Sequence, residues 1–231
     1  MTRKSLCSAL IVLAASYSVL ASPKEEVTAA AKKLGEQPNY TWKQTVVVPE
    51  GAQFRPGPTE GKIEKDGYTV VSSSFGDNTT QTVLKGTKGA MTNRDGVWES
   101  LDEVEKEEGF GRFRAAMARN LKPPAIQAAD LATGTKDLKK DGDTYSGDLT
   151  EETAKTLLTF RRGGGADASN AKGSVKFWVK DGALVKYEYK VKGTVSFNGN
   201  DRDVDRTTTV EITDVGSTKV TVPEQAKKKV S

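Results

Sequence analysis

The sequence predicts an α+β fold: a curved antiparallel β-sheet, or half-barrel, covered on its concave face by a few short helices. Two observations predict the sheet. Apolar and polar residues alternate with a period of two through most of the chain, which is typical of strands with one buried face. Short turns such as Asp-Gly and Lys-Gly separate these segments, so that neighbouring strands pair antiparallel. A third observation, a helical period in a few other segments, predicts the cover.

Residues 1–21 (MTRKSLCSALIVLAASYSVLA) have the three parts of a cleavable secretory signal. Arg3 and Lys4 form a basic start, an apolar run extends to Leu20, and small residues surround a cleavage site after Ala21. The run is shorter than the roughly 20 residues that a permanent helical anchor needs. We therefore expect export to the periplasm or the extracellular space, no permanent membrane anchor, and one domain over 22–231.

The composition excludes several kinds of chemistry. The chain has no histidine, and its one cysteine, Cys7, lies in the predicted signal. The usual general base, zinc ligands and nucleophile pairs are therefore missing from the exported part. The net charge of +4 includes Arg3 and Lys4, and the remainder is too small for a nucleic-acid-binding surface. We predict a protein that is not an enzyme, uses no cofactor and binds no nucleic acid.

The first half of the exported part begins with a helix over 24–34, which has glutamates in its first turn, lysines in its last turn and Gly35 after it. From Asn39 the period changes to two, and Trp42 and Val46 share one side of a strand. A loop rich in proline and glycine follows. Short strands then continue through VWESL as a meander.

The middle of the chain is mainly helical. Residues 110–121 predict an amphipathic helix, and Pro123 and Pro124 separate it from a second, short helix over 125–131. The stretch DTYSGDL predicts a strand, after which Thr150 caps a helix over 151–160. Residues 161–173 (RRGGGADASNAKG) lack periodic apolar residues, and we predict a flexible glycine-rich surface loop there.

The last part of the chain shows the cleanest alternation, with one dry and one wet face. The dry face must be covered, either by curling of the sheet or by the helices. A curved sheet under a thin, alanine-rich helical cover can enclose an apolar cavity. A solid core is the alternative.

Two acidic stretches contain carboxylates at spacings that resemble functional sites. Asp201, Asp203 and Asp205 alternate as in a calcium loop, but Arg206 and Ile212 occupy the positions where an EF-hand needs glycine and glutamate. The carboxylates of DEVEKEEG are adjacent and surrounded by polar residues, whereas acid–base catalysis needs a buried or closely paired carboxylate. We therefore predict solvated surfaces, with no metal site and no catalytic site.

Three stretches resemble a known family. They are KGAMTNRDGVWESLDE, GDTYSGDLTEETAKTLL, and SVKFWVKDGALVKYEYKVKG followed by TTTVEITDVGSTKVTVPEQ. Their order is similar to the outer-membrane lipoprotein carrier (LolA/LolB) fold and, more closely in local pattern, to the LppX/LprG lipid-binding lipoproteins. The chain departs from the latter in lacking a lipobox cysteine, and no arginine matches the carrier's lid arginine.

The resemblance implies a binding protein that holds a lipid or a lipoprotein acyl chain in an apolar cavity. Its expected partners are a hydrophobic ligand and, secondarily, envelope proteins. The alternative is an envelope sensor or interaction module with a filled core and no ligand. The predicted cavity lining consists of Trp42, Val46, Met91, Trp98, Phe110, Phe113, Met117, Leu121, Phe177, Tyr187, Tyr189 and Phe197.

Overall fold

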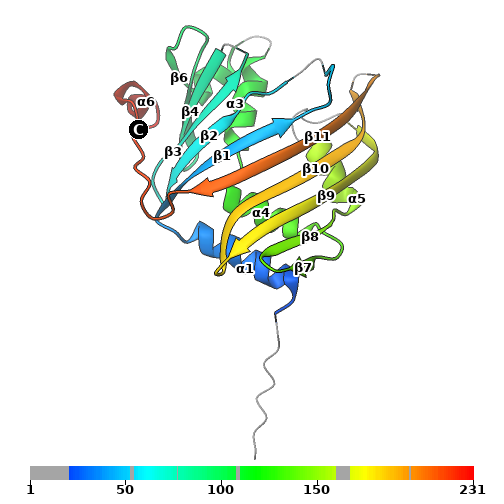
Figure 1. Ribbon diagram of the computed structural model, residues 1–231. Coiled ribbons are helices and arrows are strands. Elements are labelled where there is room, and N and C mark those ends of the chain that lie inside the picture. Colours follow the sequence, from blue (N-terminus) through cyan, green and yellow to red (C-terminus); the bar gives the residue numbers. More distant parts are fainter. Residues whose placement is uncertain (1–20, 53–54, 77, 108–109, 160–166, 198) are drawn as a thin grey trace, which may run out of the picture.

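The computed structural model describes residues 21–52, 55–76, 78–107, 110–159, 167–197 and 199–231. The predicted secretory signal, except Ala21, lies outside the described residues. Every described strand belongs to one open, curved antiparallel sheet of 11 strands (Figure 1). Helices lie against this sheet, so the predicted α+β half-barrel is confirmed.

The strand order across the sheet is β6-β5-β4-β3-β2-β1-β11-β10-β9-β8-β7. From β1 the chain runs strand by strand to the edge formed by β6. It then passes through helices to the opposite edge, formed by β7, and returns strand by strand to the middle, where β11 pairs with β1. The bounds of the strands are β1 (Asn39–Val47), β2 (Thr59–Glu64), β3 (Thr69–Phe75), β4 (Asn78–Lys85), β5 (Lys88–Thr92), β6 (Trp98–Ser100), β7 (Lys139–Asp141), β8 (Thr144–Asp148), β9 (Asp167–Lys180), β10 (Ala183–Phe197) and β11 (Asn200–Thr213).

The four predicted helices are present within a few residues of their predicted bounds. A capping box at Ser22 begins the first, and the Thr150 hydroxyl accepts the Thr153 N–H at the start of the fourth. Two further short helices, α2 and α6, were not predicted. The bounds are α1 (Pro23–Gly35), α2 (Leu101–Glu105), α3 (Gly111–Arg119), α4 (Pro124–Thr133), α5 (Glu151–Thr159) and α6 (Glu224–Lys229).

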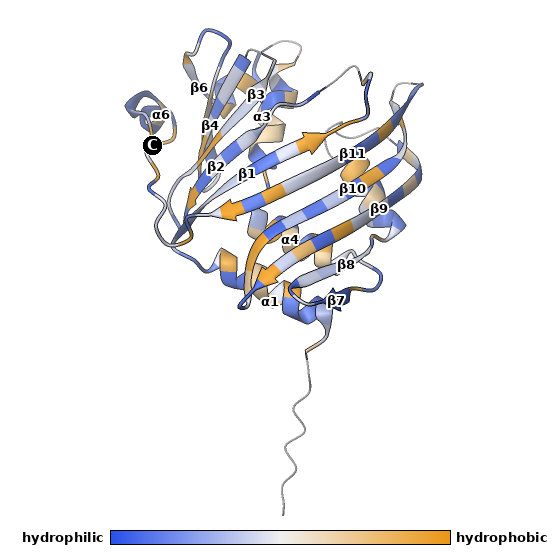
Figure 2. Cartoon of the chain, viewed as in Figure 1, coloured by the Kyte–Doolittle hydropathy of each residue, from blue (hydrophilic) through white to orange (hydrophobic). Residues whose placement is uncertain are grey.

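Hydrophobic and hydrophilic residues alternate along the long strands (Figure 2). This alternation gives the sheet an inner face, which is the concave side that carries Trp42 and Tyr187, and an outer face. The inner face of β1 and β8–β11 is covered by α1, α4 and α5, which lie behind these strands in Figure 1. The largest core cluster lies there and includes the fully buried Phe177 and Tyr187. This end of the molecule has a filled interior.

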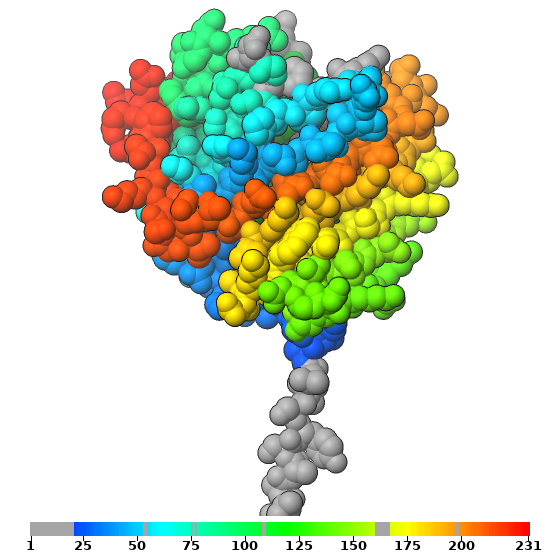
Figure 3. All heavy atoms as spheres, viewed as in Figure 1, coloured from blue at the N-terminus to red at the C-terminus, as the bar shows by residue number. Residues whose placement is uncertain are grey.

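The other end of the sheet is covered on both faces. On the inner side, α2 and α3 pack on β4 and β5 through a small cluster around Met91, Leu101 and Val104. On the outer side, α6 packs over Trp98 and Val83. The helices therefore do not all lie on the concave face, because the C-terminal helix covers part of the convex one. Figure 3 shows the C-terminal segment at the margin of the outer surface of β1 and β9–β11.

The predicted loop over 161–173 is wrong for its second half, because β9 already begins at Asp167. The alternation is hidden by an irregularity in the pairing with β10, next to Asn170, whose φ is 53°. On either side of it, Ala168 and Ala171 are both buried. Asn170 and Ala171 of β9 together lie opposite the single residue Gly193 of β10, as in a β-bulge. Residues 160–166 lie outside the described residues.

Candidate functional site

The middle of the inner face is less covered than its two ends. The pairing Gln44–Thr59, Thr59–Ser73 and Ser73–Thr80 places these residues side by side across β1 to β4. Val46 lies two positions beyond Gln44 on the same face. All five side chains are half-buried, whereas those under the helices are buried. We call this set the central strip. It is made of three short hydroxyl side chains, one glutamine and one valine.

The α3 helix presents an apolar face that is not packed in the cluster beneath it. Its buried residues are Gly111, Ala115 and Ala118, and the two alanines belong to the cluster with α2. Phe110, which directly precedes the helix, is 65% exposed and Met117 is 37% exposed. The Phe110 ring lies 4.7 Å from that of Phe113. Larger apolar side chains are thus left outside while the alanines pack.

The direction of this face follows from Leu121, just after α3. Leu121 is half-buried and packs against the large core cluster under α1, α4 and α5, not against the cluster under α3. At helical spacing, Phe110, Phe113, Met117 and Leu121 share one side. We call them the α3 apolar face. The C-terminal end of α3 therefore borders the opposite helix group, and the central strip belongs to the strands between the two groups.

Neutral polar groups lie at the border of the large core. The Tyr187 hydroxyl donates to Gln127 Oε1 on α4 (2.7 Å), and Gln127 Nε2 donates to the Tyr189 hydroxyl (3.4 Å). Burial raises the pKa of Tyr40 to about 12, with a backbone hydrogen bond from Ala125 acting in the opposite direction. Burial also raises the pKa of Tyr187 well above its ordinary value. These phenols stay neutral at physiological pH and serve as fixed hydrogen-bonding groups, not as bases.

The structure divides the predicted lining residues among several places. Trp42, Phe177, Tyr187 and Tyr189 lie together in the large core, and Met91 lies in the cluster under α3. Val46 belongs to the central strip. The four predicted residues of 110–121 form the α3 apolar face. Phe197 lies at the end of β10, and its side chain is outside the described residues.

Trp98 needs a correction. Met91 pairs with Glu99, so Glu99 shares the inner face and its neighbour Trp98 points to the outer one. Trp98 is buried there beneath α6. It does not line a site on the concave face, because one step along a strand reverses the side chain.

Sequence reasoning missed Gln127 and the polar members of the central strip. The period of two does place Gln44 on the side of Trp42, although it was not selected as a site residue, and Thr59, Ser73 and Thr80 then follow from strand pairing. The sequence alone does not fix that pairing. Gln127 could not be foreseen either, because its role depends on how α4 crosses the sheet.

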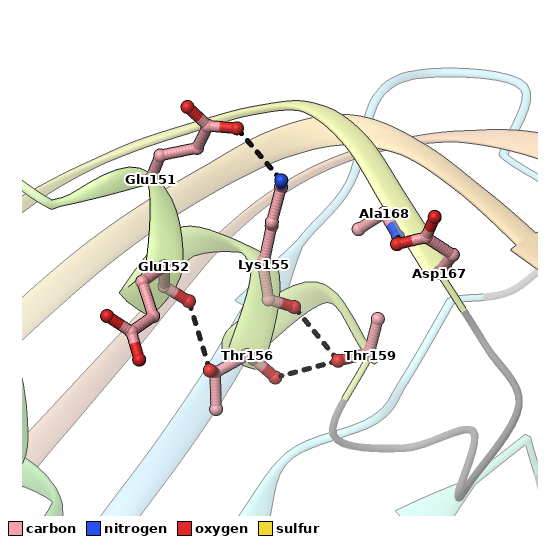
Figure 4. Close-up of a pocket in the computed structure, with 7 residues that line it drawn as sticks. All are labelled: Glu151, Glu152, Lys155, Thr156, Thr159, Asp167 and Ala168. Atoms are coloured by element: carbon pink, nitrogen blue, oxygen red, sulfur yellow. Dashed lines mark hydrogen bonds and ion pairs between the residues drawn. The ribbon is translucent and has the colours of Figure 1, made fainter.

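Two hollows elsewhere on the surface are lined mainly by polar residues. The one in Figure 4 is lined by Glu151, Glu152, Lys155, Thr156, Thr159, Asp167 and Ala168. An ion pair of 2.9 Å joins Lys155 to Glu151 beside it. The second lies between 38–39 and 64–67. Neither includes a predicted lining residue. Over the described part of the chain, no group of three or more carboxylates, thiols or imidazoles could hold a metal ion.

Comparison with known proteins finds similarity in structure only. LprF from Mycobacterium bovis covers 88% of this chain and 97% of its own, with 12% identity and a TM-score of 0.49. The lipoprotein LppX of Mycobacterium tuberculosis covers 86% and 97%, with 8% identity and a TM-score of 0.49. A DUF1329 family protein from Desulfovibrio piger covers 84% and 92%, with 10% identity and a TM-score of 0.34.

No family model and no curated protein matches the chain. LppX is also the protein whose family the three sequence stretches resemble. No helix within the described ranges has the length and apolar character that crossing a membrane requires.

Proposed function

We propose that this protein binds an apolar ligand, a lipid or an acyl chain, between the α3 apolar face and the central strip, and holds it without chemical change. The observation that carries the proposal is the α3 apolar face itself. A helix that packs through alanines and leaves Phe110 and Met117 exposed presents its larger apolar surface to something other than its own core.

The binding energy would come from burial. Each methylene removed from water contributes about 0.8 kcal/mol, so an acyl chain gains affinity in proportion to the length it buries. The Phe110 and Phe113 rings offer flat apolar surface on one side. The short side chains of Thr59, Ser73 and Thr80 lie side by side on the inner face of the sheet. The resemblance to lipid-binding lipoproteins supports a lipid as the ligand.

A carrier fits the chemistry of the chain better than an enzyme does. The sequence has no histidine, and the buried Tyr187 phenol is hydrogen-bonded and neutral. The pattern of residues 1–21 supports export, so we place the protein in the periplasm or outside the cell. There it would hold its ligand in an aqueous compartment.

One observation favours the alternative, an envelope interaction module. Phe177 and Tyr187 were expected to line a cavity, yet both are 0% exposed in a filled core. In that case the α3 apolar face would be a contact surface for another protein, and the molecule would hold no ligand.

The test is uptake of a fluorescent fatty-acid analogue by purified, delipidated protein. Replacing Phe113 and Met117 together by serine should weaken binding by about tenfold or more, because each side chain contributes roughly 1.5–3 kcal/mol when it is fully buried. The matched control is Val215→Ser, which alters a 45% exposed valine away from α3. Absence of uptake by the unaltered protein would exclude the carrier. Stable capture of an envelope protein through α3 would then support the module.

A further inference from the structure

The inner face of β11 carries two arginines. Arg202 pairs with Val195 and Arg206 with Val191, and both valines are fully buried on the inner side of β10. Since directly paired residues share a face, both arginines lie on the concave side. Val204 separates them along the strand. This part of β11 lies beside the last turn of α5 (Figure 1).

Arg206 is held at the border between α5 and the central strip. It is half-buried, and its Nη2 donates to the carbonyl oxygen of Leu157 at 2.5 Å. On the other side, Thr208, two positions along β11, pairs with Val46 of the central strip. A carbonyl in the last turn of a helix is a common partner for arginine. A guanidinium has five donors in a planar fork, so it can hold that carbonyl and an acidic group together.

The charge of this region is of one sign. At the inward positions of β1–β4 and β9–β11 that the structure describes, the charged residues are Arg202 and Arg206. The aspartates of β11 lie on the opposite face, where Asp203 accepts from Thr194 and Asp205 pairs with Lys190 at 3.3 Å. Among the described residues, the inner face of these strands carries cations and no carboxylate, and the inward Glu99 lies on β6 at the edge of the sheet, so this part of the concave side attracts anions.

We propose that the ligand carries an anionic headgroup, a carboxylate or a phosphate, and that Arg206 binds it while the apolar chain lies along the central strip. Arg202, which is exposed nearer the start of β11, adds to the attraction. This inference rests on the proposed function and deepens it: the ligand is an acidic lipid and not a neutral one. The arginine fork matches the oxygens of either headgroup.

The test compares three probes of one chain length, namely hexadecanoate, hexadecyl phosphate and hexadecanol, below their aggregation concentrations. The unaltered protein should bind an acidic probe about tenfold more tightly than hexadecanol, because hydrogen bonds to charged groups are the stronger ones. The Arg206→Gln variant should lose this preference and keep its affinity for hexadecanol. The two acidic probes distinguish carboxylate from phosphate as the preferred headgroup.

Arg94→Gln is the charge-matched control, because Arg94 is exposed in the turn between β5 and β6. It should keep the preference. Equal binding of acid and alcohol by the unaltered protein, or an unchanged preference in Arg206→Gln, would overturn the headgroup inference and leave the proposed function standing. Failure of all three probes would instead refute the proposed function.

If Arg206→Gln no longer folds, Arg206→Lys decides the question. Lysine keeps the charge but not the fork, so it should reduce the preference for hexadecanoate severalfold. If Arg206→Lys keeps an unchanged preference for both acidic probes, the proposal that Arg206 binds the headgroup is contradicted.

Discussion

Gly61 shows how closely the inner face is packed around one side chain. It pairs with Trp42 across β1 and β2, and a Cβ atom at Gly61 would lie 2.0 Å from the Trp42 ring. The indole therefore lies flat against the backbone of the neighbouring strand. Sequence reasoning placed Trp42 on the inner face but gave no reason for a glycine opposite it.

We predict that Gly61→Ala lowers the free energy of unfolding by about 1–3 kcal/mol, because the indole must move inside a filled core. Urea unfolding followed by tryptophan fluorescence measures the change. Gly35→Ala at the end of α1 is the control. Its Cβ would meet only Ala125 Cβ at 3.5 Å, an ordinary contact, and we expect a change within about 1 kcal/mol. Equal effects of the two substitutions would contradict the packing described for Trp42.

For single residues, the sequence was a better guide to the face of the sheet that a side chain occupies than to the depth at which it is buried. Phe177, Tyr187 and Tyr189 were correctly placed with the inward residues of their strands. Their depth depends on α1, α4 and α5, which come from distant parts of the chain. Trp98 was misplaced because a face can be assigned only after the register of β5 and β6 is known.

Among the elements, α3 shows what a helical pattern leaves undecided. The spacing of Phe110, Phe113, Met117 and Leu121 correctly predicted a helix with one apolar side. The side that packs, however, is the one with Ala115 and Ala118, since small residues allow the close approach of α2. A pattern based on hydrophobicity gives most weight to the larger residues. It therefore does not identify the alanine side of α3 as the side that contacts α2.

An ion pair between Lys229 and Glu103 joins the α6 helix to α2. Lys229 Nζ donates to both carboxylate oxygens of Glu103, at 2.8 and 2.9 Å. The hydrogen bond from Lys229 and those from Ser100 lower the pKa of Glu103 to about 2 from 4.5. A lowered pKa means that the folded state favours the carboxylate. The stabilisation is therefore complete above pH 4.5 and is lost as the pH falls through about 2.

We predict that the packing of α6 on the sheet loosens slightly as the pH falls over this range, which raises the exposure of Trp98 by a small amount, because the ion pair is exposed to solvent and the apolar cluster around Trp98 remains. Quenching of tryptophan fluorescence by acrylamide measures that exposure. Glu103→Gln should give the same increase in quenching at neutral pH. Glu224→Gln should not, because the partner of Glu224, Lys227, lies on α6 itself. An acid-independent quenching curve would show that the ion pair does not hold α6.

For the molecule as a whole, the cover of the sheet is unequal. The large core joins α1, α4 and α5 to the longest strands, whereas only a small cluster holds α2 and α3. Local stability follows the amount of buried apolar contact. We therefore expect α2 and α3, at the end of the molecule that carries the α3 apolar face, to detach from the sheet more readily than α1, α4 and α5.

We predict that backbone amides of α3 exchange with deuterium on the order of ten- to a hundredfold faster than those of α1. Hydrogen-exchange mass spectrometry of the two helices measures the ratio. A bound acyl ligand should slow exchange in α3 and leave α1 unchanged. Equal protection of both helices without ligand would mean that the small cluster is as stable as the large core.

Most of the architecture was predictable, because alternation and turns specify an antiparallel meander. The pairing of β11 with β1 could not be predicted, because a local sequence pattern does not specify which distant strand pairs with the free edge of β1. The glycine-rich start of β9 was missed for a different reason. A bulge there shifts the alternation that would otherwise mark a strand.

The pairing of β1 with β11 also dictates the order of folding. β1 and β11 are the first and last strands in the sequence, yet they are neighbours in the middle of the sheet. Most of the described chain lies between them in sequence. Contacts between residues so distant in sequence form slowly. A chain emerging from its N-terminus can build hairpins from β2 to β6, but β1 remains without this partner until the last strand appears. The complete sheet is therefore a late product of synthesis.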